Sequence, residues 1–216
     1  MAMTTFAILL GGRLVATTRL SSQLLGARFI AADGGMAHAE TLGVTPELWL
    51  GDFDSASETL LARFPETPRE THPPDKSLTD GELAVERALT LGARRLILVG
   101  AMGGARTDHG VGHLLHAVAL AERGVEVMLT SGDEEGYPLL AGEVSLDLPS
   151  GSLFSIMGFS DLTRLSIDNA RYPLDDFHLP FGSSRTLSNV AEGPITLKLG
   201  SGRAVTLARP YDMTGV

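Results

Sequence analysis

The feature that most constrains the fold is a regular alternation of two patterns over about the first 130 residues. Short apolar runs, each long enough for one strand, are separated by stretches with helical spacing. The runs are Phe6–Leu10, Arg28–Ala32, Leu48–Leu50, Arg95–Val99 and Val125–Leu129, and the helical stretches are Leu20–Leu25, Met36–Leu42, Ser57–Phe64, Asp80–Leu91 and Val111–Arg123. This alternation predicts an α/β fold, with a mostly parallel sheet flanked by helices on both faces.

The helix expected at Asp80–Leu91 carries its own start signal. Thr79 stands just before it, and Glu82 follows three residues later. This spacing predicts a capping box, in which each of the two side chains binds the backbone N–H of the other residue.

The pattern changes after about Thr130. The segment "SGDEEGYPLLAGE" (131–143) is rich in glycine and acid and is interpreted as a linker. Short strand patterns separated by turn residues then follow, at Glu143–Leu148, Leu153–Met157, Leu162–Ile167, Ile195–Leu199 and Ala204–Leu207. The second part of the chain is therefore predicted to be a smaller, all-β sandwich without helices.

Composition narrows the classes of function. The chain has a net charge of −9 and a pI near 5.1, which argues against a nucleic-acid partner. It contains no cysteine, so disulfides, thiolate nucleophiles and cysteine metal sites are excluded. The apolar run Phe6–Leu10 is too short for a signal peptide or a membrane span. We expect a cytoplasmic protein with no membrane partner.

Acidic residues follow several of the predicted strands. Asp33 comes directly after the second strand, Asp52 and Asp54 after the third, and Asp80 opens a helix. Asp108 follows the fourth strand through a glycine-rich loop. Because ligands of an open α/β sheet bind at the carboxyl ends of the strands, these acids are expected to meet at one edge.

The stretch "GDFDS" (51–55) sharpens this expectation. In an extended segment, Asp52 and Asp54 would lie on one side with Cα atoms roughly 6.6 Å apart. Two carboxylates so close repel each other unless they share a cation, and a hard-oxygen set suits Mg²⁺ with substrate phosphates. A nucleotide is therefore indicated. Simple capping by Asp54 or Ser55, and a plain turn at Asp33, stay open as alternatives.

Two glycine-rich loops follow strands, "LLGGRL" at 9–14 and "GAMGGARTDHG" at 100–110. Such loops can present backbone N–H groups to phosphate, and Arg106 adds a cationic fork beside Asp108. The sequence contains neither a Walker A motif nor G-x-G-x-x-G. His109 next to Asp108 does not by itself establish a catalytic dyad, and the absence of G-x-S-x-G disfavours a serine hydrolase.

Taken together, these pieces resemble the thiamine pyrophosphokinase (thiamin diphosphokinase) family. The matching stretches are "LLGGRL", "AADGG" (31–35), "PELWLGDFDS" (46–55), "KSLTDGELA" (76–84), "GGARTDH" (103–109) and "LSN" (187–189). The resemblance implies an α/β nucleotide-binding catalytic domain at 1–132 and a β-sandwich thiamine-binding domain at 140–216. It also implies a homodimer with an active site shared between subunits. The implied reaction moves a pyrophosphoryl group from ATP, the co-substrate, to the hydroxyl of thiamine, giving thiamine diphosphate and AMP.

The resemblance also implies roles for individual residues. Asp33, Asp52, Asp54 and Asp80 would bind magnesium, and Asp54, Asp80, Arg106 and Asp108 would be the catalytic residues. Nucleotide binding would involve Gly11, Gly12, Asp33, Gly34, Lys76, Thr79, Gly103, Gly104 and Arg106. Tyr172 would stack on thiamine, with Ser188 and Asn189 nearby; a half-buried strand aromatic is an equally good interpretation of Tyr172.

The chain departs from the family pattern at several positions. Ser77 replaces an aspartate, Ala105 is inserted before Arg106, His113 stands where asparagine is common, and Val190 where glutamate is frequent. Two other functions therefore stay open. One is pyrophosphoryl transfer to a different alcohol, such as a hydroxymethylpterin, and the other is non-catalytic binding of a nucleotide or thiamine.

Overall fold

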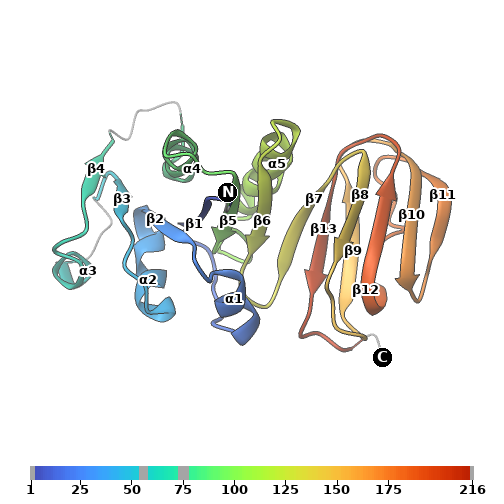
Figure 1. Cartoon of the computed structure of the whole chain (residues 1–216), viewed down its shortest axis with the longest axis horizontal. Helices are drawn as coiled ribbons and strands as arrows, with labels where there is room; N and C mark the ends of the chain where they lie inside the picture. The colour runs from blue at the N-terminus through green and yellow to red at the C-terminus, as the bar shows by residue number, and fades with distance from the viewer. Residues whose placement is uncertain (1–2, 54–57, 73–77, 215–216) are drawn as a thin grey trace. The chain divides into compact units, whose positions relative to one another are not determined.

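The protein is represented by a computed structural model that describes residues 3–53, 58–72 and 78–214. The chain divides into two compact units (Figure 1). The first unit comprises residues 1–113 and 125–132, and the second comprises residues 114–124 and 133–216. The mixed α/β class predicted from the sequence is confirmed.

The first unit is built on parallel strands. They are β1 (Thr5–Leu9), β2 (Arg28–Ala32), β3 (Leu48–Gly51), β4 (Arg69–Thr71), β5 (Arg95–Val99) and β6 (Glu126–Thr130), in the spatial order β6-β5-β1-β2-β3-β4. All five pairings along this path are parallel. Strand β1 lies in the middle, so that Ile8 is opposite Ile30 on one side and Leu98 on the other. The short strand β4 was not predicted from the sequence.

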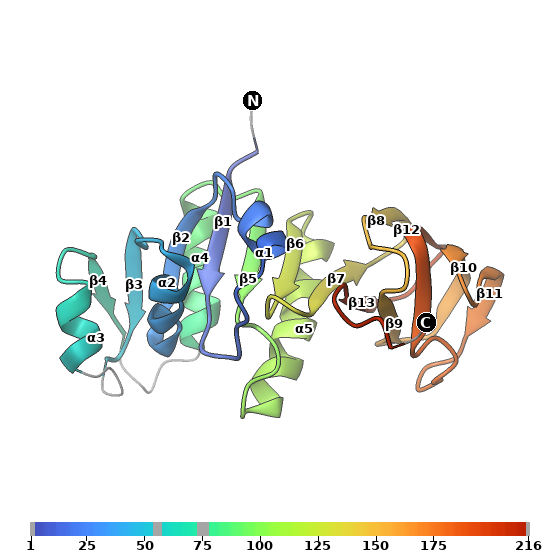
Figure 2. The ribbon, with the colours of Figure 1, turned by 90° about the horizontal axis from the view of Figure 1, so that it is seen from below.

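Helices cover both faces of this sheet. They are α1 (Thr18–Gln23), the 3-10 helix η1 (Asp33–Met36), α2 (Ala37–Leu42), α3 (Glu58–Arg63) and α4 (Asp80–Thr90), while α5 (Thr107–Glu122) begins in the first unit and continues into the second. Figures 1 and 2 show α2 on one face and α4 on the other. Side chains of α1 and α2, such as Leu20 and Ala39, pack in one core cluster with Leu9 and Trp49, while α4 packs against β1, β2 and β3.

The ends of these helices follow from local chemistry. The Thr17 hydroxyl accepts the Leu20 N–H at the start of α1, and α2 ends at Gly43 in the left-handed conformation (φ 66°). The capping box predicted at Thr79 and Glu82 is confirmed, with N–H to side-chain oxygen distances of 2.9 and 3.2 Å. Because α5 begins at Thr107 rather than Val111, Asp108 lies in its first turn and not in the preceding loop.

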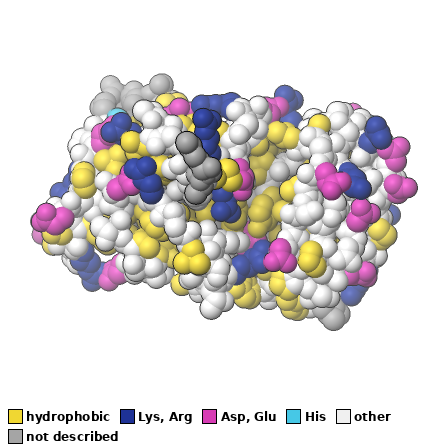
Figure 3. Space-filling view, in the orientation of Figure 1, with side chains coloured by type: hydrophobic (Ala, Val, Ile, Leu, Met, Phe, Trp, Pro, Cys, Tyr) yellow, Lys and Arg dark blue, Asp and Glu magenta, His cyan; other side chains and the backbone are white. Residues whose placement is uncertain are grey.

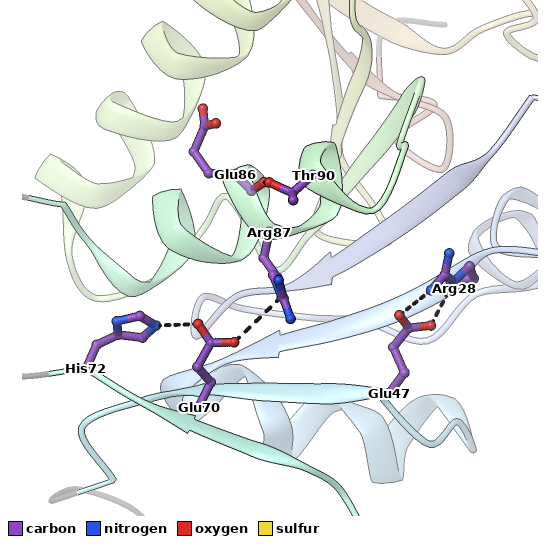
Figure 4. A network of polar contacts seen from close by, with 7 residues as sticks. All are labelled: Arg28, Glu47, Glu70, His72, Glu86, Arg87 and Thr90. Atoms are coloured by element: carbon purple, nitrogen blue, oxygen red, sulfur yellow. Dashed lines mark hydrogen bonds and ion pairs between the residues drawn. The ribbon is translucent and has the colours of Figure 1, made fainter.

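Polar contacts hold the outer part of the sheet, as Figure 4 shows. Glu70 of β4 accepts from His72 at 3.2 Å and lies 3.6 Å from Arg87 of α4. Arg28 of β2 makes a bidentate pair with Glu47, at 2.8 and 2.6 Å. Exposed pairs of this kind contribute about 0–1 kcal/mol each, so they add little to the stability of the sheet.

The strands of the second unit pair in antiparallel fashion. They are β7 (Glu135–Leu139), β8 (Gly142–Leu146), β9 (Leu153–Gly158), β10 (Leu162–Ala170), β11 (Leu174–Leu179), β12 (Asn189–Leu199) and β13 (Ala204–Arg209). The order β11-β10-β12-β9-β13-β7 runs through them, with β8 also pairing with β12. Phe154, Ile156, Leu165 and Leu197 are among the residues of its core. The linker interpretation of 131–143 is wrong in part, because β7 pairs with β13 along its whole length, and β11 was also missed.

Charged side chains of both signs are interspersed on the face shown in Figure 3. Exposed ion pairs of the second unit include Arg164 with Asp176 and Lys198 with Glu143. In the described ranges, none of the helices combines the length and apolar character needed to cross a membrane.

Candidate active site

A hollow of about 630 Å³ opens at the carboxyl ends of the parallel strands in the first unit. The loops after β1, β2, β3 and β5 meet there with the first turns of α4 and α5. Its lining comprises residues 10–12, 32–34, 52, 78–81, 100–101, 104–106, 109, 110 and 113. Strand β1 has β2 on one side and β5 on the other, so the hollow lies where the strand order reverses. This is the usual ligand site of an open α/β sheet.

Close backbone packing shapes the loop after β1. The Gly12 N–H donates to the Gly100 carbonyl at 2.9 Å, and the His38 Nε2 donates to the Gly12 carbonyl at 2.8 Å. A Cβ atom on Gly12 would lie 2.3 Å from the Gly100 oxygen, and Gly100 itself has a φ of 71°. Glycine is therefore required at both positions for the two loops to approach each other.

The first acid of the site sits on a constrained backbone. Asp33 has a φ of 42°, in the left-handed region that few non-glycine residues adopt. The buried Trp49 holds it there, because the indole Nε1–H donates to the Asp33 carbonyl at 2.9 Å. A Cβ atom on Gly51 would lie 3.3 Å from the Asp33 Cα, so the end of β3 passes close by.

The extended geometry expected for Asp52-Phe53-Asp54 is wrong. Strand β3 ends at Gly51, and Phe53 has a φ of 61°, which turns the chain out of the strand. The Phe53 ring packs edge-on against Trp49, with ring centroids 5.0 Å apart. This aromatic contact accounts for the turn. The Phe53 ring packs against the core beside β3 and does not point to the opposite side of an extended strand from the acids.

The expected convergence of acids is observed in part, because Asp108 does not line the hollow. Asp33, Asp52 and Asp80 all line the hollow, although they follow three different elements. Asp54, Asp75, Lys76 and Ser77 lie outside the described residues. Within the described ranges, no three His, Asp or Glu side chains are close enough together to hold a metal ion on their own.

Most of the glycine and threonine positions expected to bind nucleotide also line the hollow: Gly11, Gly12, Gly34, Thr79 and Gly104. Gly103 is not among its lining residues; a Cβ atom there would face the Arg13 side chain at 3.5 Å. The inserted Ala105 lies in the lining beside Arg106, so the insertion keeps the arginine at the site.

Arg106 and Asp108 form an exposed bidentate pair at the start of α5. The guanidinium Nε and one Nη donate to the two carboxylate oxygens at 3.0 and 2.6 Å. This hydrogen bonding lowers the pKa of Asp108 to about 2. Arg106 lines the hollow whereas Asp108 does not, and a guanidinium held through two of its five N–H groups keeps three for another anion. Asp108 thus orients Arg106, and its carboxylate is not paired in a dyad with the His109 ring.

Two histidines of α5 line the hollow but were not assigned to the site from the sequence. His109 and His113 have ring centroids 6.3 Å apart. The His113 Nδ1 lies 2.9 Å from the Ala101 carbonyl, and burial lowers the pKa of His113, with a smaller contribution from His109. Four-residue spacing on one helix face could have indicated both, had the helix been predicted to begin at Thr107.

The residues expected to contact thiamine lie in the second unit. Tyr172 is 57 % exposed, between β10 and β11. Asn189 is buried, and its side chain accepts from the Tyr172 N–H at 3.1 Å and donates to the Tyr172 carbonyl at 2.9 Å. Ser188 has a φ of 57° and its N–H donates to the Ser155 hydroxyl. Asn189 therefore fixes the backbone of Tyr172, while the tyrosine ring itself is accessible.

The chain is similar to known proteins in both sequence and fold. A sequence profile described as "Thiamin pyrophosphokinase, catalytic domain" matches residues 25–129, and one described as "Thiamin pyrophosphokinase, vitamin B1 binding domain" matches residues 143–203. A thiamine pyrophosphokinase of Bacillus subtilis (strain 168) is 26% identical over 165 residues, which cover 74% of this chain and 77% of that protein.

Solved structures agree on the fold. A crystal structure of thiamine pyrophosphokinase from Bacillus subtilis superposes with a TM-score of 0.85 at 24% identity, over 97% of this chain and 100% of that one. The corresponding structure from Geobacillus thermodenitrificans gives a TM-score of 0.80 at 23% identity, over 99% and 100% of the two chains.

Proposed function

The chain belongs to the thiamin pyrophosphokinase family, and from this premise we propose that it transfers a pyrophosphoryl group from ATP to the hydroxyl of thiamine. The products would be thiamine diphosphate and AMP. One observation carries the proposal: three aspartates, two glycine-rich loops and Arg106 line a single hollow at the reversal of strand order.

We propose that this hollow holds the triphosphate of ATP. The first turns of α4 and α5 both reach it, and helix N-termini favour bound anions. Gly11 and Gly12 bring backbone close to the ligand without a side chain, and Arg106 adds a fixed positive charge. Asp108 would act indirectly, by keeping the guanidinium in one orientation.

Asp33, Asp52 and Asp80 are the described residues proposed to hold Mg²⁺, with Asp54 a fourth expected from the sequence. Their carboxylates are the hard donors that Mg²⁺ prefers. Since Mg²⁺ typically takes only one or two protein carboxylates and completes its shell with phosphate and water, a cage of three is not needed. When bound, the ion would offset the negative charge of the triphosphate.

The chain's own residues would then align the reactants. The thiamine hydroxyl must lie in line with the β-phosphorus, so that the new O–P bond forms as the bond to AMP breaks. Asp80 or Asp54 would accept the hydroxyl proton. Arg106 and the loop N–H groups would stabilise the charge that develops on the phosphoryl oxygens.

For the second half of the chain we propose thiamine binding, in an all-β sandwich that corresponds to the predicted domain 140–216. The accessible ring of Tyr172 would stack on thiamine, and Asn189 would support it through the backbone. Val190, where the family often has glutamate, is buried in β12 and paired with Leu153 of β9, so it has no accessible side chain to offer a substrate.

We also propose a homodimer with an active site shared between subunits. Exposed apolar side chains of the second unit, Phe181 (68 % exposed) and Leu187 (47 %), support a partner surface there. Sedimentation of the purified chain would test the assembly. The cytoplasmic location expected from the sequence stays a prediction.

Product analysis tests the reaction. The protein is mixed with ATP, Mg²⁺ and thiamine, and nucleotides and thiamine esters are separated. AMP and thiamine diphosphate in equal amounts, formed only with metal present, are expected. ADP in place of AMP would contradict pyrophosphoryl transfer. AMP formed only with another alcohol would contradict thiamine as the acceptor, and Mg²⁺-dependent ATP binding without any product would identify a binding protein.

A further inference from the structure

His113 occupies a position in the hollow that the proposed roles above do not use. It extends from α5 toward the loop after β5 and the first turn of α4. It is half-buried and lines the hollow together with Gly81, next in sequence to Asp80.

The contact with Ala101 fixes which ring nitrogen carries the proton. The Nδ1 lies 2.9 Å from the Ala101 carbonyl oxygen, which can only accept a hydrogen bond. Nδ1 must therefore be the donor, and in the neutral ring Nε2 is left with a lone pair. Burial is the largest influence on His113 and lowers its pKa, while the Ala101 contact opposes the shift.

The space in front of Nε2 is open because residue 81 is glycine. A Cβ atom built on Gly81 would lie 3.8 Å from the His113 Nε2 and 2.9 Å from the Leu10 side chain. Any larger side chain would fill the gap between Nε2 and the start of α4. Among the described residues, none donates a hydrogen bond to Nε2.

We propose that the Nε2 atom of His113 accepts a hydrogen bond from a hydroxyl group of the bound substrate, and so acts as a specificity-determining residue. This inference rests on the proposed function, in which the hollow binds ATP and a hydroxyl-bearing acceptor. Two hydroxyl sources are chemically equivalent here: the ribose of ATP and the alcohol that receives the pyrophosphoryl group.

Two substitutions separate the acceptor atom from the structural bond. His113→Asn places an amide near the position of Nδ1, so it keeps a donor for Ala101 but offers nothing at the position of Nε2. His113→Gln reaches the position of Nε2 with a carbonyl oxygen but loses the bond to Ala101. A purely structural role predicts that the asparagine variant behaves like the wild type and that the glutamine variant is impaired.

The nucleotide arm measures dissociation constants for ATP, 2′-deoxy-ATP and 3′-deoxy-ATP by calorimetry with Mg²⁺. If the ribose is the donor, the wild type binds one deoxy-nucleotide about tenfold more weakly than ATP. His113→Asn loses this discrimination and His113→Gln retains part of it. If the acceptor alcohol is the donor, discrimination is the same in all three proteins, and kcat/KM for thiamine falls about tenfold in His113→Asn.

A third readout does not depend on turnover. Long-range ¹⁵N–¹H NMR of the histidine rings, with His113 assigned from the asparagine variant, reports which nitrogen is protonated. The proposal expects Nδ1–H with an unprotonated Nε2. A proton on Nε2 in the neutral ring would overturn it, as would changes below about twofold in both the nucleotide and the thiamine arms.

The failure of the proposed function gives a different result. In that case the wild type makes no AMP and thiamine diphosphate. The NMR measurement of the tautomer and the calorimetry with ATP and its deoxy forms still decide the role of His113.

Discussion

The two units of the molecule hold their functional residues in different ways. In the first unit, groups far apart in sequence are brought together because parallel strands all end at the same edge. Asp33, Asp52 and Gly100 reach one hollow through three separate loops. In the second unit, Asn189 binds the backbone of Tyr172 through pairing of neighbouring antiparallel segments. The first arrangement depends on close backbone contacts, the second on one buried side chain.

The largest effect on turnover is expected at an acid of the first unit. Asp52→Asn removes a charge from the hollow and should lower kcat about 100-fold, with a loss of a few kcal/mol of transition-state stabilisation. Thermal unfolding should be nearly unchanged. Glu143→Gln, which alters an exposed acid of β8, is the control; equal turnover in both variants would refute a role for Asp52.

Backbone contact can be tested with two glycines of the same hollow. Gly12→Ala puts a Cβ atom 2.3 Å from the Gly100 oxygen, whereas the position of a Cβ on Gly34 has nothing within 4 Å. Gly12→Ala should lower the free energy of unfolding by about 1–3 kcal/mol and weaken ATP binding. Gly34→Ala should have little effect on stability in chemical denaturation. If both variants lose the same stability, close approach of the loops is not what requires Gly12.

In the second unit, the corresponding test is a substitution of Asn189. Asn189→Ala leaves the Tyr172 N–H and carbonyl without their partners and should cost about 1–3 kcal/mol in urea unfolding. It should raise KM for thiamine while leaving ATP binding intact. Ser145→Ala, at an exposed hydroxyl of β8, serves as the control and should stay within about 0.5 kcal/mol. A parallel loss of ATP affinity would contradict a division of labour between the units.

His113 should make the free energy of unfolding depend on pH. Its pKa in the folded protein is lowered below 6.5. At a pH between the pKa of His113 in the folded protein and 6.5, the unfolded chain binds more protons than the folded one. Stability therefore falls as pH drops below about 6.5. The decline is complete once pH is below the folded pKa. His113→Asn should remove this part of the pH dependence, measured by urea unfolding between about pH 5 and pH 8; an unchanged profile would contradict burial of the neutral ring.

The smallest effect on stability is expected at the exposed pair formed by Arg106 and Asp108 at the start of α5. Arg106→Gln removes the guanidinium, so the pKa of Asp108 should rise from about 2 toward 3.8. The interaction is fully present above pH 3.8 and is lost as pH falls through about 2, but both side chains are exposed, so its removal should change stability little near neutral pH. Carboxyl ¹³C NMR titration measures this. An Asp108 pKa that stays near 2 would show that the helix start, and not Arg106, is responsible.

Sequence patterns predicted the first unit better than the second. The runs at Arg28–Ala32 and Arg95–Val99 coincide with β2 and β5, because buried parallel strands are continuously apolar and stand out from their surroundings. Strand β7 was taken for a linker, because Gly136 and Pro138 are turn residues in most contexts and only pairing with β13 makes them a strand. The three-residue β4 is too short to show any period.

The candidate site was partly predictable for the same reason. Residues that directly follow a strand, such as Asp33 and Asp52, could be placed because the strand end fixes them. His109 and His113 were missed because their contribution depends on where α5 begins, and helix ends are poorly determined by sequence. The left-handed turn at Phe53 depends on Trp49, which no local pattern reveals.

The central place of β1 also governs when the hollow can be completed. On the ribosome the chain appears from its N-terminus, so β1 can pair with β2, and β2 with β3, early, but β1 must wait for β5 on its other side. The bond from Gly12 to Gly100 cannot form until residue 100 has left the exit tunnel. A nascent chain halted before β5 would expose one edge of β1, whose unpaired backbone N–H and C=O groups favour pairing with other chains and aggregation. Completion of β5 thus closes this edge, and the residues that follow it, from Gly100 to His113, complete the ligand site.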